Sequence, residues 1–289
     1  MSEFRDLTPL LEPKSVAIVG ASPKSGWPAR IWGMLRHFRY PGEIYLVNPR
    51  YETLWERPCY PSLEALPQVV DNAVFIVPAN VVLEMLQQSQ HSKFRAATIL
   101  SGGFGEGDDA EGLTRKEFLQ AYARAHATPM CGPNCMGLAS MRSRAMLFPE
   151  QRLNDLRHGG LAMVSQSGGL LGGLVRAGLS RGIGVSYFVT SGNEVVAELS
   201  DYIHHFLQDE HTKIIAAFIE GIKDADKFIR VAKEALAAGK PIIALKIGRS
   251  GEAVAAALAH TGSLAGNDRV FDAVSRSMAS LESTISTSF

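Results

Sequence analysis

The sequence predicts an α/β protein with two parallel, doubly wound sheets and helices on both faces of each sheet. Short apolar runs rich in β-branched residues alternate with longer amphipathic stretches along most of the 289 residues. Strands that alternate with helical patterns form βαβ units, and buried parallel strands appear in the sequence as such apolar runs. The length suffices for two domains of ordinary size, and a hydrophobic content of 46% supports packed cores.

The first half of the chain is expected to contribute four main strands. Their ranges are 15–19, 44–47, 73–77 and 97–100. Helical patterns lie between them, for example at 81–91 and 113–127. We therefore expect the first domain, residues 1–150, to be a parallel sheet covered by helices.

The pattern is interrupted at the polar stretch 151–158, which Pro149, Gly159 and Gly160 flank. We place a second domain at residues 151–289. Its expected strands are 161–164, 185–189, 214–219 and 242–246, and its expected helices are 170–179, 195–207 and 226–238. A further helical pattern at 269–278 is followed by a segment rich in Ser and Thr at 279–289, where another strand is usual. The sequence thus leaves open a second domain that is incomplete at its C-terminal end.

Composition excludes several classes of protein. The net charge is zero, so neither nucleic acid nor an acidic membrane surface is indicated as a partner. The cysteines Cys59, Cys131 and Cys135 are too few for a disulfide scaffold and lack the spacing of a zinc site, so no metal is expected. The N-terminus lacks the apolar core of a signal peptide, and no apolar run is long enough to span a bilayer. A reducing, cytoplasmic setting is expected.

The first expected strand runs into the turn Gly20-Ala21-Ser22. A turn of small residues before a helix lets backbone N–H groups approach a phosphate, and the helix N-terminus favours negative charge. The turn matches neither G-x-G-x-x-G nor the P-loop pattern, which weakens a nicotinamide or P-loop interpretation. A tight turn without a ligand remains equally compatible with these residues.

A second turn of this kind is Ser165-Gln166-Ser167-Gly168, which again separates an expected strand from a helix. Hydroxyl and N–H groups would converge there on an anion at the positive end of the helix. A nucleophilic role for Ser165 is disfavoured, because the G-x-S-x-G elbow is missing and no Ser/His/Asp order is evident. We expect a phosphate-binding loop.

His260 lies between an alanine-rich helical run and the Gly/Ser-containing stretch 261–266. A nucleophilic histidine needs one free nitrogen and a carboxylate that fixes the other. Glu220 is the candidate carboxylate, because it ends an expected strand and ligands in open α/β sheets gather at the carboxyl ends of strands. An ordinary loop histidine and a helix-capping or surface glutamate are the alternatives.

At this point the chain resembles a known family, the α-type half of the NDP-forming acyl-CoA synthetases, which include ADP-forming acetyl-CoA synthetase and relatives of succinyl-CoA synthetase. The resemblance runs from about residue 14 to about residue 273. It is carried by KSVAIVGAS at 14–22, VNPRY at 47–51, VPA at 77–79, SGGF at 101–104, GPNCMG at 132–137, SQSG at 165–168, SGNE at 191–194, EGIKD at 220–224 and HTGSLAG at 260–266. It implies a Rossmann-like CoA-binding domain followed by a flavodoxin-like domain of the succinyl-CoA synthetase type.

The resemblance also implies roles for single residues. CoA phosphates would lie at Gly20, Ala21 and Ser22, the nucleotide portion at Asn48, Pro49, Arg50, Val77, Pro78 and Ala79, and the pantetheine end at Ser101, Gly102, Asn134 and Cys135. In the second domain, His260 matches the phosphorylated histidine and Glu220 the acid that orients it. The phosphate of that histidine would be held by Ser165, Gln166, Ser167 and Gly168.

The implied reaction is acyl-CoA + phosphate + ADP ⇌ acid + CoA + ATP, through an acyl phosphate and a phosphohistidine. In this family the nucleotide and its Mg bind an ATP-grasp module, for which the chain has no room. A partner subunit or a further domain would supply it, so an oligomer is expected and turnover by the chain alone is not. The acyl group, and ADP versus GDP, are not readable.

Two other functions remain as alternatives. One is a regulatory CoA- or acyl-CoA-binding module without chemistry, which would need neither His260 nor Glu220. The other is a nicotinamide-dependent oxidoreductase, which usually carries an acidic residue after the second strand to hold the ribose. The sequence there is Val47-Asn48-Pro49-Arg50, without an acid.

Overall fold

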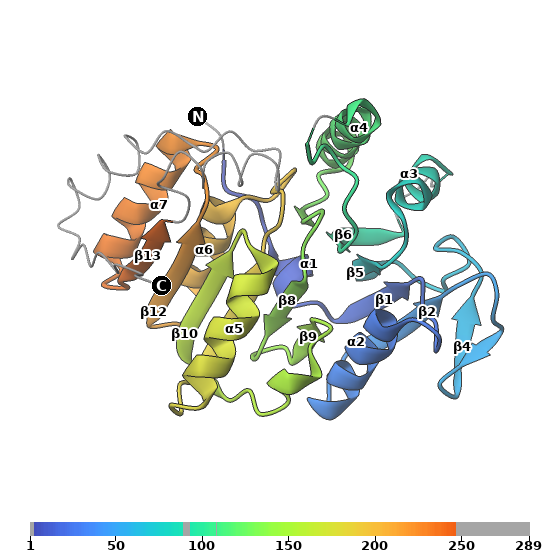
Figure 1. Ribbon diagram of the computed structural model, residues 1–289, viewed down its shortest axis with the longest axis horizontal. Coiled ribbons are helices and arrows are strands. Elements are labelled where there is room, and N and C mark those ends of the chain that lie inside the picture. Colours follow the sequence, from blue (N-terminus) through green and yellow to red (C-terminus); the bar gives the residue numbers. More distant parts are fainter. Residues whose placement is uncertain (1–2, 89–92, 108, 247–289) are drawn as a thin grey trace.

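The structure is a computed structural model that describes residues 3–88, 93–107 and 109–246. Within these ranges the chain forms two mostly parallel sheets with helices on both faces, as the sequence predicts (Figure 1). The expected helix at 269–278 and the segment 279–289 lie outside the described residues. Every helix in the described part is too short or too polar to span a bilayer.

The first sheet has seven strands in the order β3-β4-β2-β1-β5-β6-β7. Their bounds are Ser15–Val19 (β1), Glu43–Val47 (β2), Thr53–Leu54 (β3), Arg57–Tyr60 (β4), Val70–Phe75 (β5), Phe94–Ile99 (β6) and Met130–Cys131 (β7). All pairs are parallel except the β3–β4 hairpin. Strand β1 lies in the centre, and all five of its residues are buried, which explains why its apolar run is continuous.

Helices cover both faces of this sheet. Helix α2 (Gly26–His37) packs on one face, and α3 (Ala79–Gln88) and α4 (Ala110–His126) pack on the other (Figure 1). Alternate residues of β1 point to opposite faces. Val16 and Ile18 therefore share a core with Ile31 of α2, whereas Ala17 and Val19 share one with the other two helices.

The second sheet has six strands in the order β13-β12-β10-β11-β8-β9. Their bounds are Gly137–Ser140 (β8), Ala145–Leu147 (β9), His158–Ser165 (β10), Val185–Thr190 (β11), Ile214–Ile219 (β12) and Ile242–Lys246 (β13). A 3₁₀ turn, η1 (Gln151–Leu153), precedes β10, and α5 (Gly168–Leu179) covers one face. Helices α6 (Leu199–Gln208) and α7 (Ala225–Ala237) cover the other (Figure 1).

The change of sheet occurs earlier in the chain than residue 150, where the sequence places the domain boundary. Strand β8 already pairs antiparallel with β11, so the chain leaves the first sheet after β7 and enters the second at Gly137. Strands β8 and β9 are three or four residues long. Runs that short carry too little periodicity to be recognised from sequence.

Helix α6 begins at Leu199, four residues later than the helical pattern suggests. Its start is set by a capping box, in which Glu198 and Asp201 each accept a hydrogen bond from the other's backbone N–H. Residues 195–198 are left as a loop, and this loop follows the turn that approaches the first sheet.

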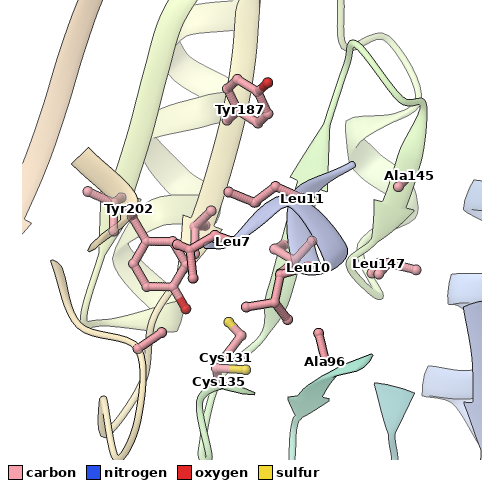
Figure 2. Close-up of a cluster of buried hydrophobic side chains, with 14 of the residues drawn as sticks. Leu7, Leu10, Leu11, Ala96, Cys131, Cys135, Ala145, Leu147, Tyr187 and Tyr202 are labelled. Carbon is pink, nitrogen blue, oxygen red and sulfur yellow. The ribbon is translucent and has the colours of Figure 1, made fainter. Parts of the chain in front are cut away.

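The N-terminal helix α1 (Thr8–Leu11) is wedged between the two sheets. Figure 2 shows Leu7, Leu10 and Leu11, all fully buried, among side chains from both sheets. Asn72 of the first sheet donates a hydrogen bond to the Leu10 carbonyl (3.2 Å), and Ser143, in the β8–β9 turn, donates one to the Leu11 carbonyl (3.0 Å). The segment therefore fixes how the two sheets sit against each other.

Candidate functional site

The β1–α2 turn approaches the end of β5 closely. Gly20 has φ +88°, and a Cβ at this position would lie 2.6 Å from the Ile76 carbonyl oxygen, so a side chain is excluded. The N–H groups of Gly20 and Ala21 donate to the Val47 carbonyl (2.9 and 3.2 Å) and are therefore already occupied. The capacity of this turn to bind an anion rests on Ser22 and on the exposed start of α2 at Gly26.

The residues that follow β2 lie beside the β1–α2 turn. Asn48 donates from Nδ2 to the Ala21 carbonyl (2.8 Å) and accepts the Arg50 N–H (2.9 Å), which ties the ends of β1 and β2 together. Pro49 and Arg50 are exposed. Val77 lies against Gly20, Pro78 is exposed, and Ala79 is buried at the start of α3. The structure thus brings together the residues that the family resemblance assigns to the nucleotide portion of CoA.

The loop after β6 is held by an acidic side chain that sequence reasoning missed. Glu106 accepts the N–H groups of Gly103 and Phe104 (2.7 and 2.8 Å). Ser101 presents a buried Oγ that has no hydrogen-bond partner among the described residues, and Gly102 is exposed beside it. Burying a hydroxyl without a partner costs on the order of 1–3 kcal/mol, so this atom is a candidate to contact a ligand.

In the loop after β7, Asn134 adjoins the Ser101 segment, whereas the side chain of Cys135 is buried. The Asn134 N–H donates to the Ser101 carbonyl (2.8 Å), so the two predicted pantetheine segments adjoin. Cys135 is 3% exposed, and its Sγ donates to the Ile99 carbonyl (3.3 Å). A hydrogen bond with Cys131 and burial raise the pKa of the Cys135 thiol well above its usual value. The thiol therefore lies in the core.

The carboxyl edges of the two sheets meet at this loop. The Asn193 and Val195 N–H groups, after β11, donate to the carbonyls of Pro133 and Gly132 (3.0 and 3.2 Å). Asn134 Nδ2 also donates to Asn193 Oδ1 (3.2 Å). The approach is so close that a Cβ on Gly192 would lie 2.3 Å from the Pro133 carbonyl oxygen. The 191–195 loop and the 132–134 loop therefore form one continuous surface.

The turn between β10 and α5 places Ser165 and Ser167 at the N-terminus of a helix. Ser165 is fully buried, and its hydroxyl bonds within the turn, donating to the Ser167 carbonyl (2.8 Å) and accepting the Ser167 N–H (3.1 Å). This closed hydroxyl is not poised as a nucleophile. Ser167 is the N-cap of α5 and makes no side-chain capping bond, and Gly168 and Gly169 begin the helix. The N–H groups at the start of this helix have no side-chain partner among the described residues, and such groups can bind an anion.

The side chain of Gln166 contacts the ends of neighbouring strands. Its Nε2 donates to Glu194 Oε2 (2.9 Å) and to the Gly221 carbonyl (2.8 Å), and its Oε1 accepts the N–H groups of Glu220 (2.6 Å) and Gly221 (3.0 Å). Its own N–H donates to Phe218 (3.3 Å). The side chain thus ties three strand ends together, and its contact with a phosphate stays a prediction.

Glu220 directly follows β12 at the same edge of the sheet and is half-buried. Its N–H is held by Gln166, and its carbonyl accepts a hydrogen bond from Lys246 Nζ (3.0 Å). The backbone of this residue is therefore fixed on both sides. His260 lies outside the described residues, so the pairing of Glu220 with His260 stays a prediction.

Glu194 is a second residue that sequence reasoning missed. The side chain is buried, its Oε1 accepts the Ser191 hydroxyl (2.7 Å), and Oε2 accepts Gln166. Burial raises the pKa of Glu194 to about 7, although the Lys223 ammonium lowers it. The SGNE motif at 191–194 contains this residue, but an acidic residue in a loop is normally expected to be a solvated side chain. No cluster suited to a metal ion occurs among the described residues.

Comparison with known proteins relates both halves of the chain to described families. Residues 14–141 match the CoA binding domain family, and residues 158–284 match the succinyl-CoA ligase like flavodoxin domain family. Acetate–CoA ligase (ADP-forming) I of Archaeoglobus fulgidus is 34% identical over 276 residues, which are 95% of this chain and 39% of that protein. The alpha subunit of Acetate–CoA ligase (ADP-forming) I of Pyrococcus furiosus is 37% identical over 272 residues, 92% of this chain and 58% of that subunit.

A solved structure with the same arrangement comes from Ca. Korarchaeum cryptofilum, the dinucleotide forming acetyl-coenzyme A synthetase 1 in complex with phosphate and ADP. The TM-score is 0.86 at 31% sequence identity, over 94% of this chain and 58% of that one. The chain therefore spans between about two fifths and three fifths of the length of these relatives.

Proposed function

The chain belongs to the family of ADP-forming acyl-CoA synthetases, and from that premise we propose that it supplies the α-type part of such an acid–thiol ligase. Its reaction would be acyl-CoA + phosphate + ADP ⇌ acid + CoA + ATP. Phosphate attacks the thioester carbonyl and releases CoA, which leaves an acyl phosphate. His260 takes the phosphoryl group and releases the acid, and the phosphoryl group then passes to ADP. An ATP-grasp subunit or domain would hold that nucleotide and its Mg.

One observation carries this proposal: the two predicted ligand regions adjoin. The pantetheine end of CoA is expected at the loops after β6 and β7, and the phosphate at the start of α5. Hydrogen bonds join the two regions through the 191–195 loop: Asn193 and Val195 donate to the 132–134 loop, and the Ser191 N–H donates to the Ser165 carbonyl (2.8 Å). A thioester at one region and a phosphate at the other could therefore meet, which holds reacting groups in place and lowers the entropic part of the barrier.

In the first domain, Ser22 and the N-terminus of α2 would hold CoA phosphates, with the exposed Arg50 guanidinium beside them. Gly20 and Ala21 shape this turn, because their N–H groups are used by Val47. The buried Oγ of Ser101 would bond an amide of pantetheine, which gives that hydroxyl a partner that it lacks among the described residues.

In the second domain, Ser167 and Gly168 would hold the phosphoryl group at the N-terminus of α5, which offsets its negative charge. A side chain at Gly168 would lie 2.6 Å from Met136 Cγ, so the backbone approaches the first-sheet loops closely here. Glu220 would accept the Nδ1–H or Nε2–H of His260 and steady the cation that forms on phosphoryl transfer.

Calorimetry with CoA on this chain, with NAD as the control ligand, tests the first domain. We expect micromolar binding of CoA and none of NAD. Phosphohistidine formation is then measured with acyl-CoA and phosphate, after an ATP-grasp partner has been added. The variant His260→Asn is expected to bind CoA normally and to accept no phosphoryl group.

The outcomes separate the candidate functions. CoA binding without phosphorylation of the wild-type chain would favour a regulatory CoA-binding module over a ligase. Phosphorylation of His260→Asn would show that another residue carries the phosphoryl group. Tighter binding of NAD than of CoA would support an oxidoreductase instead.

A further inference from the structure

Glu194 occupies a position that costs folding free energy in two ways. Its backbone lies in the left-handed region (φ +51°), which non-glycine residues avoid at a cost on the order of 1–2 kcal/mol. Its carboxyl group is also buried, at 4% exposure of the residue, where the charged form is poorly solvated. Glycine or asparagine would suit the backbone better. A carboxyl group retained at such a cost calls for a role in function.

Two contacts lead from this carboxyl group to the proposed phosphate site. Its Oε2 accepts a hydrogen bond from Gln166 Nε2. Oε1 of Gln166 in turn accepts hydrogen bonds from the N–H groups of Glu220 and Gly221. Through Oε1 it accepts the hydroxyl of Ser191 (2.7 Å). That hydroxyl has a second acceptor in reach, the carbonyl oxygen of Ser165 (3.4 Å), at the start of the 165–168 turn.

We propose that Glu194 is a positioning residue that takes up a proton when a phosphoryl group is loaded at the 165–168 turn, with Gln166 and Ser191 carrying the change. The inference rests on the proposed function, because it assumes that the start of α5 binds phosphate. It adds a proton-coupled group to a site whose expected members, Glu220 and His260, do not include it.

The proton balance of this step is simple. Before loading, the ionised form of Glu194 accepts hydrogen bonds at both oxygens. A bound phosphate dianion adds like charge nearby, and one proton from solution then binds Oε1. The new O–H donates to Ser191 Oγ, whose own hydrogen turns to the Ser165 carbonyl. No bond between heavy atoms forms or breaks, and the Gln166 contact at Oε2 is kept.

The groups that face Glu194 place its titration in the neutral range. Lys223, from the β12–α7 loop, donates from Nζ to the carbonyls of Asn193 and Glu194 and lowers the pKa of Glu194, while Glu198 at the start of α6 raises it. Tyr202 of α6 interacts electrostatically with it as well. The 132–134 loop, Gly-Pro-Asn, contributes no charge. With burial included, the pKa reaches about 7, so both forms are populated at neutral pH.

The test is calorimetry with inorganic phosphate at pH 7, repeated in two buffers that differ in ionisation enthalpy. The difference in heat gives the number of protons taken up per phosphate bound. Phosphate itself exchanges protons near this pH, so the wild-type chain is compared with Glu194→Gln, which has the same shape and cannot titrate. Glu12→Gln is the matched control, because Glu12 is a partly buried carboxyl that accepts the Tyr187 hydroxyl (3.2 Å) and is not among the groups that shift the pKa of Glu194.

A tenfold rise in the proton affinity of Glu194 would take up about 0.4 proton at pH 7. We therefore expect the wild-type chain to take up about 0.4 proton more than Glu194→Gln, while Glu12→Gln behaves as the wild type does. Equal proton counts for the wild type and Glu194→Gln, with phosphate bound to both, would overturn the inference and leave the phosphate site standing. If the folded wild-type chain binds no phosphate, the phosphate site itself is wrong and the inference falls with it.

Discussion

The buried carboxyl of Glu194 makes the stability of the fold depend on pH in a direction opposite to that of most acidic residues. Burial raises its pKa from an ordinary 4.5 to about 7 in the folded chain. The folded state therefore binds the proton more tightly than the unfolded state does. This contribution to stability is fully present below pH 4.5, is lost between pH 4.5 and 7, and stays lost above pH 7.

The size of the effect follows from the same two values. Each pH unit between them is worth 1.36 kcal/mol, so ionisation of Glu194 costs about 3 kcal/mol of unfolding free energy. The group is buried, so no solvent screening reduces this figure. Glu194→Gln removes the charge and keeps a side chain of the same length, and so removes the dependence.

The assay is urea denaturation of the wild-type chain and Glu194→Gln at intervals from pH 4.5 to pH 8. We expect the difference in unfolding free energy to shift by about 3 kcal/mol in favour of the variant as the pH rises to 7 and to level off above it. A difference that stays constant across this range would refute the argument, because it would mean that Glu194 does not titrate between these limits.

Three further outcomes are expected, each with its own measurement. Gly192→Ala should lower the thermal midpoint far more than Gly239→Ala does. Both glycines have positive φ (59° and 65°), but only a Cβ at position 192 would meet a neighbouring carbonyl. Equal shifts of the midpoint would contradict the close contact between the 191–195 and 132–134 loops. Leu10→Ala should lower the unfolding free energy, measured in urea, by about 2–5 kcal/mol, because Leu10 is fully buried. Leu236 is 70% exposed, so Leu236→Ala should change that free energy by at most about 0.5 kcal/mol. A small effect at Leu10 would argue against its place between the sheets. Ser101→Ala should weaken CoA binding about 5–10-fold in calorimetry without destabilising the free chain, whereas unchanged affinity would remove its hydroxyl from the site.

Much of the fold could be predicted from the sequence, because the strands that form the centre of each sheet carry a strong local signal. The central strand β1 and the strand β12 have the bounds that their apolar runs predict. The signal fails where an element is short and depends on its neighbours. Helix α1 and strands β8 and β9 contain only three or four residues each, too few to show a period. Strands β8 and β9 form because β8 pairs with both β9 and β11.

The candidate site divides in the same manner. The small residues at the turns, such as Gly20 and Ser167, could be found from sequence, because a turn that follows an apolar run and precedes a helix has a local signature. The contacts of Gln166 could not, because its partners lie 28 and 55 residues away along the chain. Glu106 escaped notice for another reason: its partners Gly103 and Phe104 lie three and two residues away, but an acidic residue in a loop is usually solvated. Ser101 was expected at the pantetheine end from the family resemblance alone.

What the sequence determined by itself is therefore the kind of structure and the position of its turns: backbone conformation and hydrophobic period are local properties of a chain. The tertiary structure alone decided which polar groups became partners. Parallel strands bring their carboxyl ends to one edge, and there burial forces each polar group to find a hydrogen bond. That requirement, and not the local sequence, turned Gln166 toward Glu194 and buried the carboxyl group beside the proposed phosphate site.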